Sequence, residues 1–576
     1  MRRKLKYAAA AAAGVLLLLW LFCLPRDLFE GTTYSTVVTD RDGALLGARV
    51  TDDGQWRFPP RDTLPEKFVK ALVEFEDRTF FDHCGVSPRA LVRAAIQNIR
   101  NGRIVSGGST LTMQVIRLSR QKPRTLWQKL VETCMATRLE LRCSKEEILR
   151  LYAAHAPFGG NVVGIDAARW RYLGSDRTEL SWAEAATLAV LQNAPSSIHL
   201  ARNRDQLLAK RNRLLARLHA KGEIDEEDYA LALEEPLIGE PYPMPQYAPH
   251  LVEWYDRKAH GQRTVTHIDR GLQHRMEEVL VRWNRELRQK GIRDLAAIIV
   301  EVESGEPAAY CGNSDLSFDR DGKWVDIARS PRSSGSILKP LLYAAALEQG
   351  TILPNSLLPD VPMDFGGFAP KNFDGTYAGA IEADQALALS LNIPNVYLLK
   401  EYGILRFVET LRQAGLKTLS RPADEYGLSL ILGGAEVTLM DIATCYARMA
   451  ACYQESTRYP DFPLHDRVAL YRTFEAMREV VRPDEMDWRR ASSAQNIAWK
   501  TGTSYGSRDA WAIGLTPKYV IGVWAGNANG SGVADLTGAR IAGPVLFELF
   551  GLLSGCGWFE EPGDKEGTIR SVCSHS

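Results

Sequence analysis

The sequence lacks a net charge and a high cysteine content, and each of these absences excludes a class of protein. It also has no internal repeats. Lys and Arg number 70 and Asp and Glu number 70, so the formal net charge is zero, without the basic excess of a nucleic-acid-coating protein. Nine cysteines in 576 residues are too few for a disulfide scaffold, and none has the CxxC spacing of a zinc site. We therefore expect no nucleic-acid partner and no zinc centre.

The length and composition indicate several folded domains. A chain of 576 residues allows three or four domains. Its 45% hydrophobic and 24% charged residues are close to the averages of globular proteins, so each domain can bury a core and general disorder is excluded.

The N-terminus predicts a membrane anchor. Arg2, Arg3, Lys4 and Lys6 precede an apolar run over 7–24, and about 18 apolar residues suffice to cross a bilayer. Positively charged residues that flank a membrane span remain on the cytoplasmic side. We therefore expect a cytoplasmic tail at 1–6 and, from about Pro25 onward, a chain that lies outside the cytoplasmic membrane. A cleaved signal peptide is the alternative, although no A-x-A site follows the run.

Residues 64–194 read as a helical domain. An amphipathic helix is expected to end at Glu76, and Ser87 with Pro88 opens a second helix. Apolar stripes predict buried faces on the second helix and on a third, formed by Val92, Ala95, Ile96 and Ile99, and by Trp127, Leu130, Val131 and Cys134. Capping boxes at Ser144 and Glu147 and at Ser181 and Glu184 begin two more helices.

Five prolines within 236–249 indicate a semi-rigid connector. A short strand and a helix are expected over 264–290, followed by apolar strands over 295–302 and 519–524 with a helix over 337–348 between them. This order predicts an α+β domain whose sheet joins distant segments.

Five motifs over about 65–200 resemble those of the family 51 glycosyltransferases, the peptidoglycan polymerases. They are EDRTFFDHCG from Glu76, GGSTLTMQVIRL from Gly107, QKLVETCMATRLE from Gln128, SKEEILRLYAAHAPFGGN from Ser144 and LSWAEAATLAVLQNAP from Leu180. Taken alone, Glu76 would be an ordinary helix-end charge and the Gly-Gly-Ser-Thr segment an ordinary loop.

The resemblance implies that Glu76 is the general base for the acceptor sugar and Glu132 the second essential carboxylate, near the departing diphosphate. Candidate diphosphate and sugar ligands are Arg78, Arg93, Arg117, Lys129, Ser109, Thr110 and Gln114, with a divalent cation, magnesium or manganese, as cofactor. His83 is expected to make structural hydrogen bonds.

Two positions depart from the usual family pattern. Met113 stands where the family has Gln, and Gln128 stands where it has Arg. We expect the affinity for the diphosphate to be altered.

The second domain carries a serine nucleophile motif. Ser336 and Lys339 lie three residues apart at an expected helix start, so the hydroxyl and the amine can meet on one face. Burial and the helix N-terminus favour the neutral lysine that could activate the serine. S-x-x-K alone is a weak signal, but Ser390-Leu391-Asn392 and Lys500-Thr501-Gly502-Thr503 follow in the order typical of penicillin-interacting serine acyltransferases.

This second resemblance implies Ser336 as acylated nucleophile, Lys339 as base, and Ser390 with Lys500 as a proton relay. Asn392 would hold the substrate backbone, and Lys500, Thr501 and Thr503 its carboxylate, while Gly502 permits close backbone approach. Backbone N–H groups of Ser336 and Thr503 would form the oxyanion hole. The transpeptidase needs no cofactor.

Together the chain resembles a class A, bifunctional penicillin-binding protein, most like the 1C type, which normally continues into a further small β domain. The implied fold is multidomain: an N-terminal transmembrane helix, a mainly α, lysozyme-like glycosyltransferase domain at 40–235, a linker at 236–290, and at 291–555 an α+β transpeptidase domain, β-lactamase-like with an antiparallel sheet, followed by a tail at 556–576.

The implied function is polymerisation of lipid II into glycan strands and crosslinking of stem peptides that end in D-Ala-D-Ala, from the outer side of the cytoplasmic membrane. Implied partners are lipid II, glycan strands, stem peptides, β-lactams, the membrane and other wall-synthesis proteins. Two alternatives stay open: a polymerase whose second domain is a D,D-carboxypeptidase or a weak transpeptidase, and a wall-binding scaffold without activity.

Overall fold

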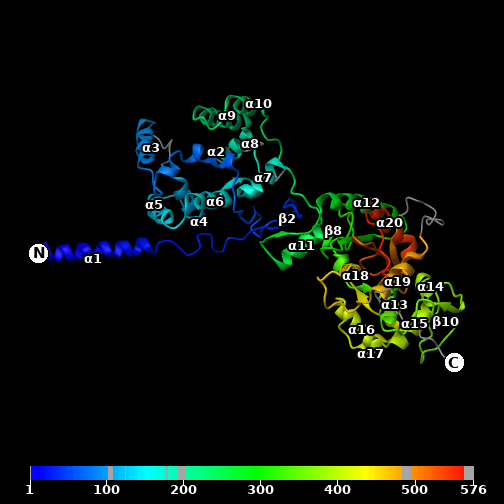
Figure 1. Cartoon of the computed structure of the whole chain (residues 1–576). Helices are drawn as coiled ribbons and strands as arrows, with labels where there is room; N and C mark the ends of the chain where they lie inside the picture. Colours follow the sequence, from blue (N-terminus) through cyan, green and yellow to red (C-terminus); the bar gives the residue numbers. More distant parts are fainter. Residues whose placement is uncertain are drawn as a thin grey trace. The chain divides into compact units, whose positions relative to one another are not determined.

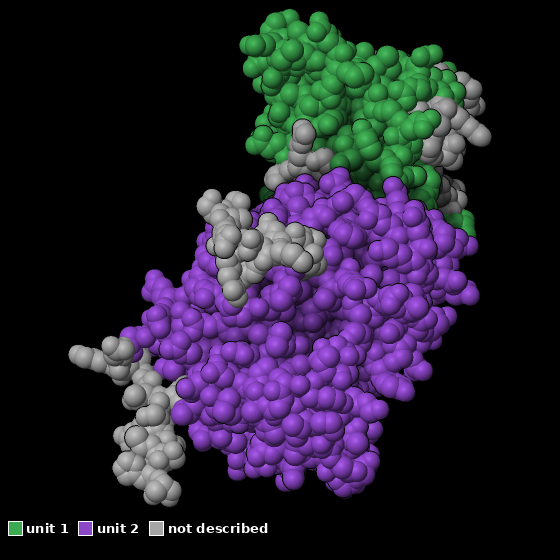
Figure 2. Space-filling view, turned by 90° about the vertical axis from the view of Figure 1, so that its right-hand side faces the viewer, with its two compact units in different colours: residues 1–39, 43–246, 252–265 green, residues 40–42, 247–251, 266–576 purple. Residues whose placement is uncertain are grey.

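The computed structural model describes residues 2–101, 108–123, 125–174, 179–192, 203–482 and 495–563. The chain divides into two compact units (Figure 2). Unit 1 comprises residues 1–39, 43–246 and 252–265, and unit 2 comprises residues 40–42, 247–251 and 266–576. Each unit has its own hydrophobic core.

Unit 1 is mainly helical (Figure 1). Its helices are α1 (Arg2–Leu21), α2 (Glu66–Glu76), α3 (Pro88–Asn101), α4 (Leu111–Arg120), α5 (Leu126–Glu140), α6 (Lys145–His155), α7 (Ile165–Leu173), α8 (Trp182–Leu191), α9 (Arg204–Ala220) and α10 (Glu226–Glu234). Its strands are β1 (Thr36–Thr39), β2 (Leu45–Arg49), β3 (Trp56–Arg57), β4 (Pro157–Gly159), β5 (Val162–Val163) and β6 (Arg263–Val265). Two small sheets have the orders β2-β1-β6 and β3-β5-β4.

The core of unit 1 forms around α8. Every residue of α8 except Glu184 is buried, as expected for a helix that is apolar on all faces, and it packs against α2 and α9. Both expected capping boxes are present, at the starts of α6 and α8. Because these signals are local, the sequence located both helix starts correctly.

The expected buried faces of α3 and α5 are wrong. Val92, Ile96 and Ile99 are 59%, 46% and 80% exposed, and the side chain of Ala95 lies outside the described residues. On α5, Trp127 and Leu130 are also exposed, Cys134 is exposed and Val131 is half-buried. Both stripes exist, but of their described side chains only the half-buried Val131 packs against the core of unit 1.

The expected membrane anchor is not confirmed. Helix α1 begins at Arg2 and ends at Leu21, so its 20 residues include all four N-terminal basic residues. In the part of the chain that the structure describes, no helix is both long enough and apolar enough to span a bilayer.

Unit 2 is an α+β unit, as expected. Its helices are α12 (Arg270–Gln289), α13 (Lys339–Glu348), α14 (Ala383–Ala388), α15 (Asn392–Tyr402), α16 (Ile404–Gln413), α17 (Ala423–Tyr426), α18 (Leu439–Tyr453), α19 (Arg467–Arg478) and α20 (Gly543–Gly551). Its strands are β7 (Asp294–Glu301), β8 (Pro307–Cys311), β9 (Arg332–Ser333), β10 (Leu357–Asp360), β11 (Gly379–Glu382), β12 (Glu436–Val437), β13 (Ala498–Thr503), β14 (Asp509–Leu515) and β15 (Tyr519–Gly526).

A five-stranded antiparallel sheet forms the centre of unit 2. Its order is β13-β14-β15-β7-β8, so strands from both ends of the domain are neighbours, as the sequence predicts. Helices α12 and α20 contact this sheet, and so does α18. The expected strands over 295–302 and 519–524 correspond to β7 and β15, whereas the helix expected from 337 begins two residues later, at Lys339.

The segment 236–290, expected as a linker, contains the predicted strand β6 and helix α12 together with α11 (Pro249–Lys258). Its proline-rich part, 236–248, contains no helix. Residues of α11 fall in both units.

Candidate active sites

The first candidate site lies where α2 ends. Phe68, Ala71 and Leu72 bury one face of α2, which leaves Glu76 half-buried at its last turn. Nε2 of Gln114, on α4, donates a 2.8 Å hydrogen bond to Oε2 of Glu76. A carboxylate at a helix end, held by one amide, can accept a proton from a nearby hydroxyl.

Tyr152 of α6 lies behind this pair. Its hydroxyl donates to Oε1 of Gln114 over 3.4 Å, an orientation that turns the amide nitrogen of Gln114 toward Glu76. Burial, and then the negative charge of Glu76, raise the pKa of Tyr152 well above its ordinary value. The phenol therefore stays protonated and keeps this donor role.

Arg117 organises the second carboxylate. Its Nη2 donates to Oε2 of Glu132 over 2.8 Å and to Oγ of Ser109 over 3.1 Å, and its Nε lies 3.2 Å from both oxygens of Glu132. Glu132 is 6% exposed, so the guanidinium compensates a buried charge. Since Arg117 follows Gln114 by three residues, one face of α4 carries the partners of both glutamates.

Thr110 and His83 hold the surrounding loop. The Thr110 hydroxyl caps α4 by accepting from the Met113 N–H, and it donates to the Gly85 carbonyl over 2.7 Å. His83 accepts from the Gly85 N–H through Nδ1 and donates through Nε2 to Asp77 over 3.0 Å. His83 is structural, as expected, whereas the Thr110 hydroxyl is used within the protein and not presented to a substrate.

The other predicted ligands lie in different settings. Arg78 is half-exposed and pairs with Glu74 over 2.9 Å. Arg93 is exposed on α3, and Lys129 is half-buried on α5. Met113 is fully buried in the core, so its replacement of Gln does not remove a donor from the site.

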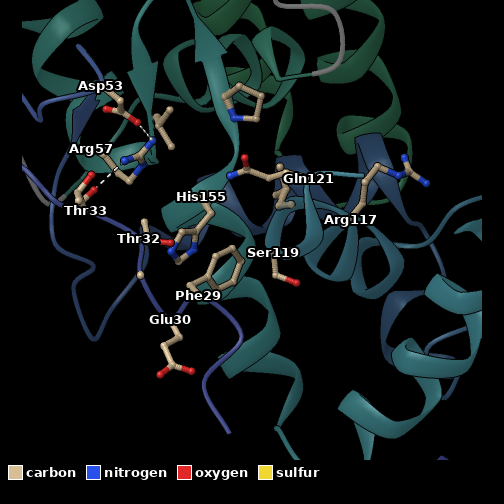
Figure 3. Close-up of a pocket in the computed structure, with 14 residues that line it drawn as sticks. Phe29, Glu30, Thr32, Thr33, Asp53, Arg57, Arg117, Ser119, Gln121 and His155 are labelled. Atoms are coloured by element: carbon tan, nitrogen blue, oxygen red, sulfur yellow. Dashed lines mark hydrogen bonds and ion pairs between the residues drawn. The ribbon is translucent and has the colours of Figure 1, made fainter. Parts of the chain in front are cut away.

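A cavity of about 460 Å³ adjoins Arg117 (Figure 3). Its lining residues are Phe29, Glu30, Gly31, Thr32, Thr33, Asp53, Arg57, Arg117, Leu118, Ser119, Gln121, His155, Pro157 and Val163. Phe29 stacks on His155 with ring centroids 3.4 Å apart, and Arg57 bonds to Thr33 and Asp53. In Figure 3 the Arg117 side chain points away from the stacked rings.

No described group of three or more His, Cys, Asp or Glu side chains could hold a metal ion. Both oxygens of Glu132 also face Arg117. The described residues therefore do not fit a divalent ion held by protein ligands alone.

The second candidate site brings three distant segments together. Ser336 lies in the turn just before α13, next to β13. A Cβ on Gly335, which has φ +52°, would lie 2.7 Å from the Thr503 nitrogen, and one on Gly502 would lie 2.9 Å from the Ser334 carbonyl oxygen. Only glycine permits this approach of the Ser336 turn to β13.

Lys339 is fully buried and contacts the Ser390 segment. Its Nζ donates to the carbonyl oxygens of Ser390 and Leu391 and to Oδ1 of Asn392, over 2.8, 3.0 and 2.9 Å. Burial, and then the charge of Lys500, lower the pKa of Lys339 well below its ordinary value. Such a lysine can act as a base near neutral pH.

Lys500 of β13 contacts the same segment. It is fully buried, and its Nζ donates to Oγ of Ser390 over 2.7 Å and to the carbonyl oxygen of Thr501 over 3.0 Å. Burial lowers the pKa of Lys500 to about 7. Ser390 has φ +57°, a strained backbone conformation of the kind that clusters at functional sites.

Thr501 and Thr503 are half-buried on β13 beside the buried Gly502, and Oγ1 of Thr503 accepts from the Gly538 N–H over 3.1 Å. Sequence reasoning missed Tyr152, Asp360 and Asn372. Asp360 and Asn372 lie in the second site, where no short spacing links them to the three segments.

Comparisons with known proteins agree with this two-site architecture. Residues 43–219 match the model of the transglycosylase family, and residues 295–546 match that of the penicillin-binding protein transpeptidase domain. The chain is 40% identical to penicillin-binding protein 1C of Escherichia coli K12 over 523 residues, which covers 90% of this chain and 68% of that protein.

More distant relatives cover a similar share. Penicillin-binding protein 1B of Vibrio cholerae is 29% identical over 86% of this chain and 69% of its own length. The crystal structure of penicillin-binding protein 1A from Haemophilus influenzae has a TM-score of 0.53 at 17% identity and covers 91% of this chain and 93% of that one, which shows a shared fold.

Proposed function

The chain belongs to the class A penicillin-binding proteins, which combine a peptidoglycan glycosyltransferase with a transpeptidase, and we propose that Glu76 and Ser336 begin its two reactions. The first reaction joins lipid-linked disaccharide units into glycan strands. The second joins their stem peptides.

In the glycosyltransferase reaction, Glu76 takes the proton of the acceptor sugar hydroxyl. The hydroxyl oxygen then attacks the anomeric carbon of the donor, and the bond from that carbon to the lipid diphosphate breaks. Arg117, held by Glu132 and Ser109, faces the departing negative charge. The arrangement that supports these roles is the shared face of α4, which carries Gln114 for Glu76 and Arg117 for Glu132.

In the transpeptidase reaction, Lys339 gives up one of its three donated hydrogen bonds when it becomes neutral, and its free electron pair then takes the proton of the Ser336 hydroxyl. Ser336 attacks the carbonyl of the penultimate D-Ala, and the terminal D-Ala leaves as an amine that receives a proton through Ser390 and Lys500. The amine of a second stem then displaces Ser336. The single observation that carries this proposal is that both buried lysines donate hydrogen bonds to Ser390, Lys339 to its carbonyl and Lys500 to its hydroxyl.

We also propose that the protein works at the outer face of the cytoplasmic membrane, where a lipid-linked substrate is accessible. The exposed apolar side chains of α3 and α5, such as Ile99 and Trp127, support contact with lipid. Leu16 and Leu19 of α1 are also exposed. Exposed apolar faces of this kind mark membrane or protein contacts.

We also propose a divalent cation at the glycosyltransferase site. Magnesium usually binds through one or two carboxylates together with substrate phosphates. Because the described residues form no ligand cluster of three, we propose that such an ion takes most of its ligands from the donor diphosphate.

The decisive experiment compares Glu76→Gln and Ser336→Ala in the full-length protein supplied with lipid-linked precursor. We expect Glu76→Gln to abolish glycan polymerisation and to leave fluorescent penicillin labelling intact, and Ser336→Ala to do the reverse. Glu66→Gln, at an exposed carboxylate of the same helix, is the matched control. Free D-Ala without crosslinks would favour a carboxypeptidase, and unchanged polymer from Glu76→Gln would refute the assigned base.

A further inference from the structure

We infer that Asp360 and Asn372 are positioning residues of the Ser336 site, which hold the start of α15 and orient the Asn392 amide toward Lys339. The inference rests on the roles proposed above for Ser336 and Lys339, and on the substrate-holding role that the family resemblance implies for Asn392. None of the three motifs contains either residue.

Asn372 is unusual in its surroundings. Residues 371 and 373–380 are all exposed, while Asn372 is 4% exposed. Asp360, at the end of β10, is 1% exposed. A buried polar side chain inside an exposed stretch needs partners, and both residues have them.

The Asn372 amide is completely used. Its Nδ2 donates to Oδ1 of Asp360 over 2.7 Å and to the Thr376 carbonyl over 2.9 Å, and its Oδ1 accepts from the Asn392 N–H over 2.9 Å. Oδ2 of Asp360 accepts from the Ala378 N–H over 2.8 Å. An ionised carboxylate only accepts, so Asp360 fixes which way the Asn372 amide faces.

This orientation caps α15. The residue before the helix, Leu391, offers no side-chain cap, and the first helical N–H groups need an acceptor. Oδ1 of Asn372 supplies it to Asn392, 20 residues further along the chain. The helix that begins with a proposed catalytic residue is thus capped from a different loop.

The same loop orients the Asn392 side chain. Its Nδ2 donates to the Lys371 carbonyl over 2.8 Å, and its Oδ1 accepts from Nζ of Lys339 over 2.9 Å. Since Lys371 directly precedes Asn372, fixing Asn372 also fixes the Lys371 carbonyl. Without that acceptor, the Asn392 amide could turn and present a donor to Lys339 instead of an acceptor.

Two isosteric variants and their combination test the pair. Asp360→Asn allows the amide at 372 to turn, and Asn372→Asp places two carboxylates together. We expect each to slow acylation of the full-length protein by fluorescent penicillin, by up to about 100-fold. The double variant Asp360→Asn with Asn372→Asp reverses donor and acceptor between the two side chains and keeps an oxygen for the Asn392 N–H. It leaves the Thr376 carbonyl without its donor, so it should recover part of the rate.

The pH profile adds a readout that simple destabilisation would not move. The charged group that acts on Lys339 is Lys500, and Oδ1 of Asn392 favours the ammonium form of Lys339. Loss of that acceptor should shift the limb of the acylation profile due to Lys339 to lower pH in Asp360→Asn and return it in the double variant. The carboxylate added by Asn372→Asp acts in the opposite direction, since a nearby negative charge favours the ammonium form.

Asp374→Asn is the matched control, because Asp374 lies in the same loop, is exposed, and bonds only to Thr376 among the described contacts. Thermal unfolding checks that each variant folds. Single variants with the wild-type rate and profile would overturn the inference, as would a folded double variant that recovers neither. Labelling that persists in Ser336→Ala would instead refute the proposed nucleophile itself.

Discussion

Nζ of Lys500 donates a 2.7 Å hydrogen bond to Oγ of Ser390, although 110 positions separate the two residues in the chain. Burial lowers the pKa of Lys500 to about 7, so its amine can lose and regain a proton near neutral pH. This contact gives the proposed relay a testable dependence on pH.

Lys500→Arg should remove one limb of the pH profile. If protonated Lys500 supplies the proton for the leaving group, the acylation rate of the wild type falls as pH rises through about 7. A guanidinium stays protonated throughout, so the variant should keep its rate into the alkaline range, at a level about tenfold lower because its geometry differs. The measurement is the rate of penicillin acylation from about pH 5 to about pH 10, a range that covers the titration of histidine and of most lysine side chains. Lys518→Arg, at an exposed lysine, is the control, and a falling limb that stays near 7 in Lys500→Arg would contradict the relay.

Gly335→Ala should disrupt the second site through a steric clash. The new Cβ would lie 2.7 Å from the Thr503 nitrogen, which forces the Ser336 turn away from β13. We expect the rate of penicillin labelling to fall at least tenfold, which corresponds to an increase of about 1.4 kcal/mol in the activation free energy. Gly350→Ala is the matched control, since it also has a positive φ, +69°, but open space around it. Equal labelling of the two variants would show that the contact does not matter.

Gln114→Glu should move the polymerisation profile to higher pH. A second carboxylate at the position of the amide, 2.8 Å from Oε2 of Glu76, would place two negative charges side by side, and such a pair shares a proton. The pair loses this proton only as the pH is raised, so activity at pH 7 should fall and should return in part at higher pH. Polymer length and rate measured across this range test the expectation. Gln121→Glu serves as the control on the exposed end of α4, and an unmoved profile in Gln114→Glu would separate Glu76 from the proton transfer.

Chelation of divalent ions should affect one activity only. We expect EDTA to slow polymerisation and to leave penicillin labelling unchanged, because the second site uses lysines and serines. Elemental analysis should find less than stoichiometric magnesium or manganese in the protein without its lipid-linked substrate, since the described residues form no ligand cluster. A tightly bound ion in the isolated protein would contradict the proposal that the diphosphate supplies most ligands.

Charges placed on α3 should impair work on a membrane-embedded substrate. Val92→Asp with Ile99→Asp introduces carboxylates at exposed apolar positions, so folding should be unaffected while contact with lipid becomes unfavourable. Polymerisation of precursor in vesicles should fall severalfold, and polymerisation of a short-chain precursor in solution should not. Leu231→Asp, at an exposed leucine of α10, is the control. Equal loss in vesicles and in solution would indicate damage to the fold instead.

The predicted features that the structure reproduces depend on local or strictly periodic signals. Capping boxes such as Ser144 with Glu147 act within one turn, and the apolar run of β7 is continuous. Periodicity also identified the apolar stripe of α3. It cannot distinguish a helix face that packs against a protein core from one that stays exposed, so the prediction that Ile99 is buried was wrong.

The sites were predictable only where their motifs are compact. The approach of β13 to Ser336 is a tertiary contact. The order of the three motifs along the chain suggests it, and the close packing at Gly335 and Gly502 explains how it forms. Asn372 could not be found in this way, because an asparagine in a polar loop is typical of turns. Only the folded chain shows that its amide meets Asn392 and Asp360.

The outward-facing apolar side chains of α3 and α5 also govern the behaviour of the protein in the test tube. Exposed apolar faces of this kind favour association in aqueous buffer, so we expect purified molecules to associate more as their concentration rises. Detergent micelles compete for the same surfaces. The measured particle size should therefore depend on the detergent and not on substitutions of the catalytic residues.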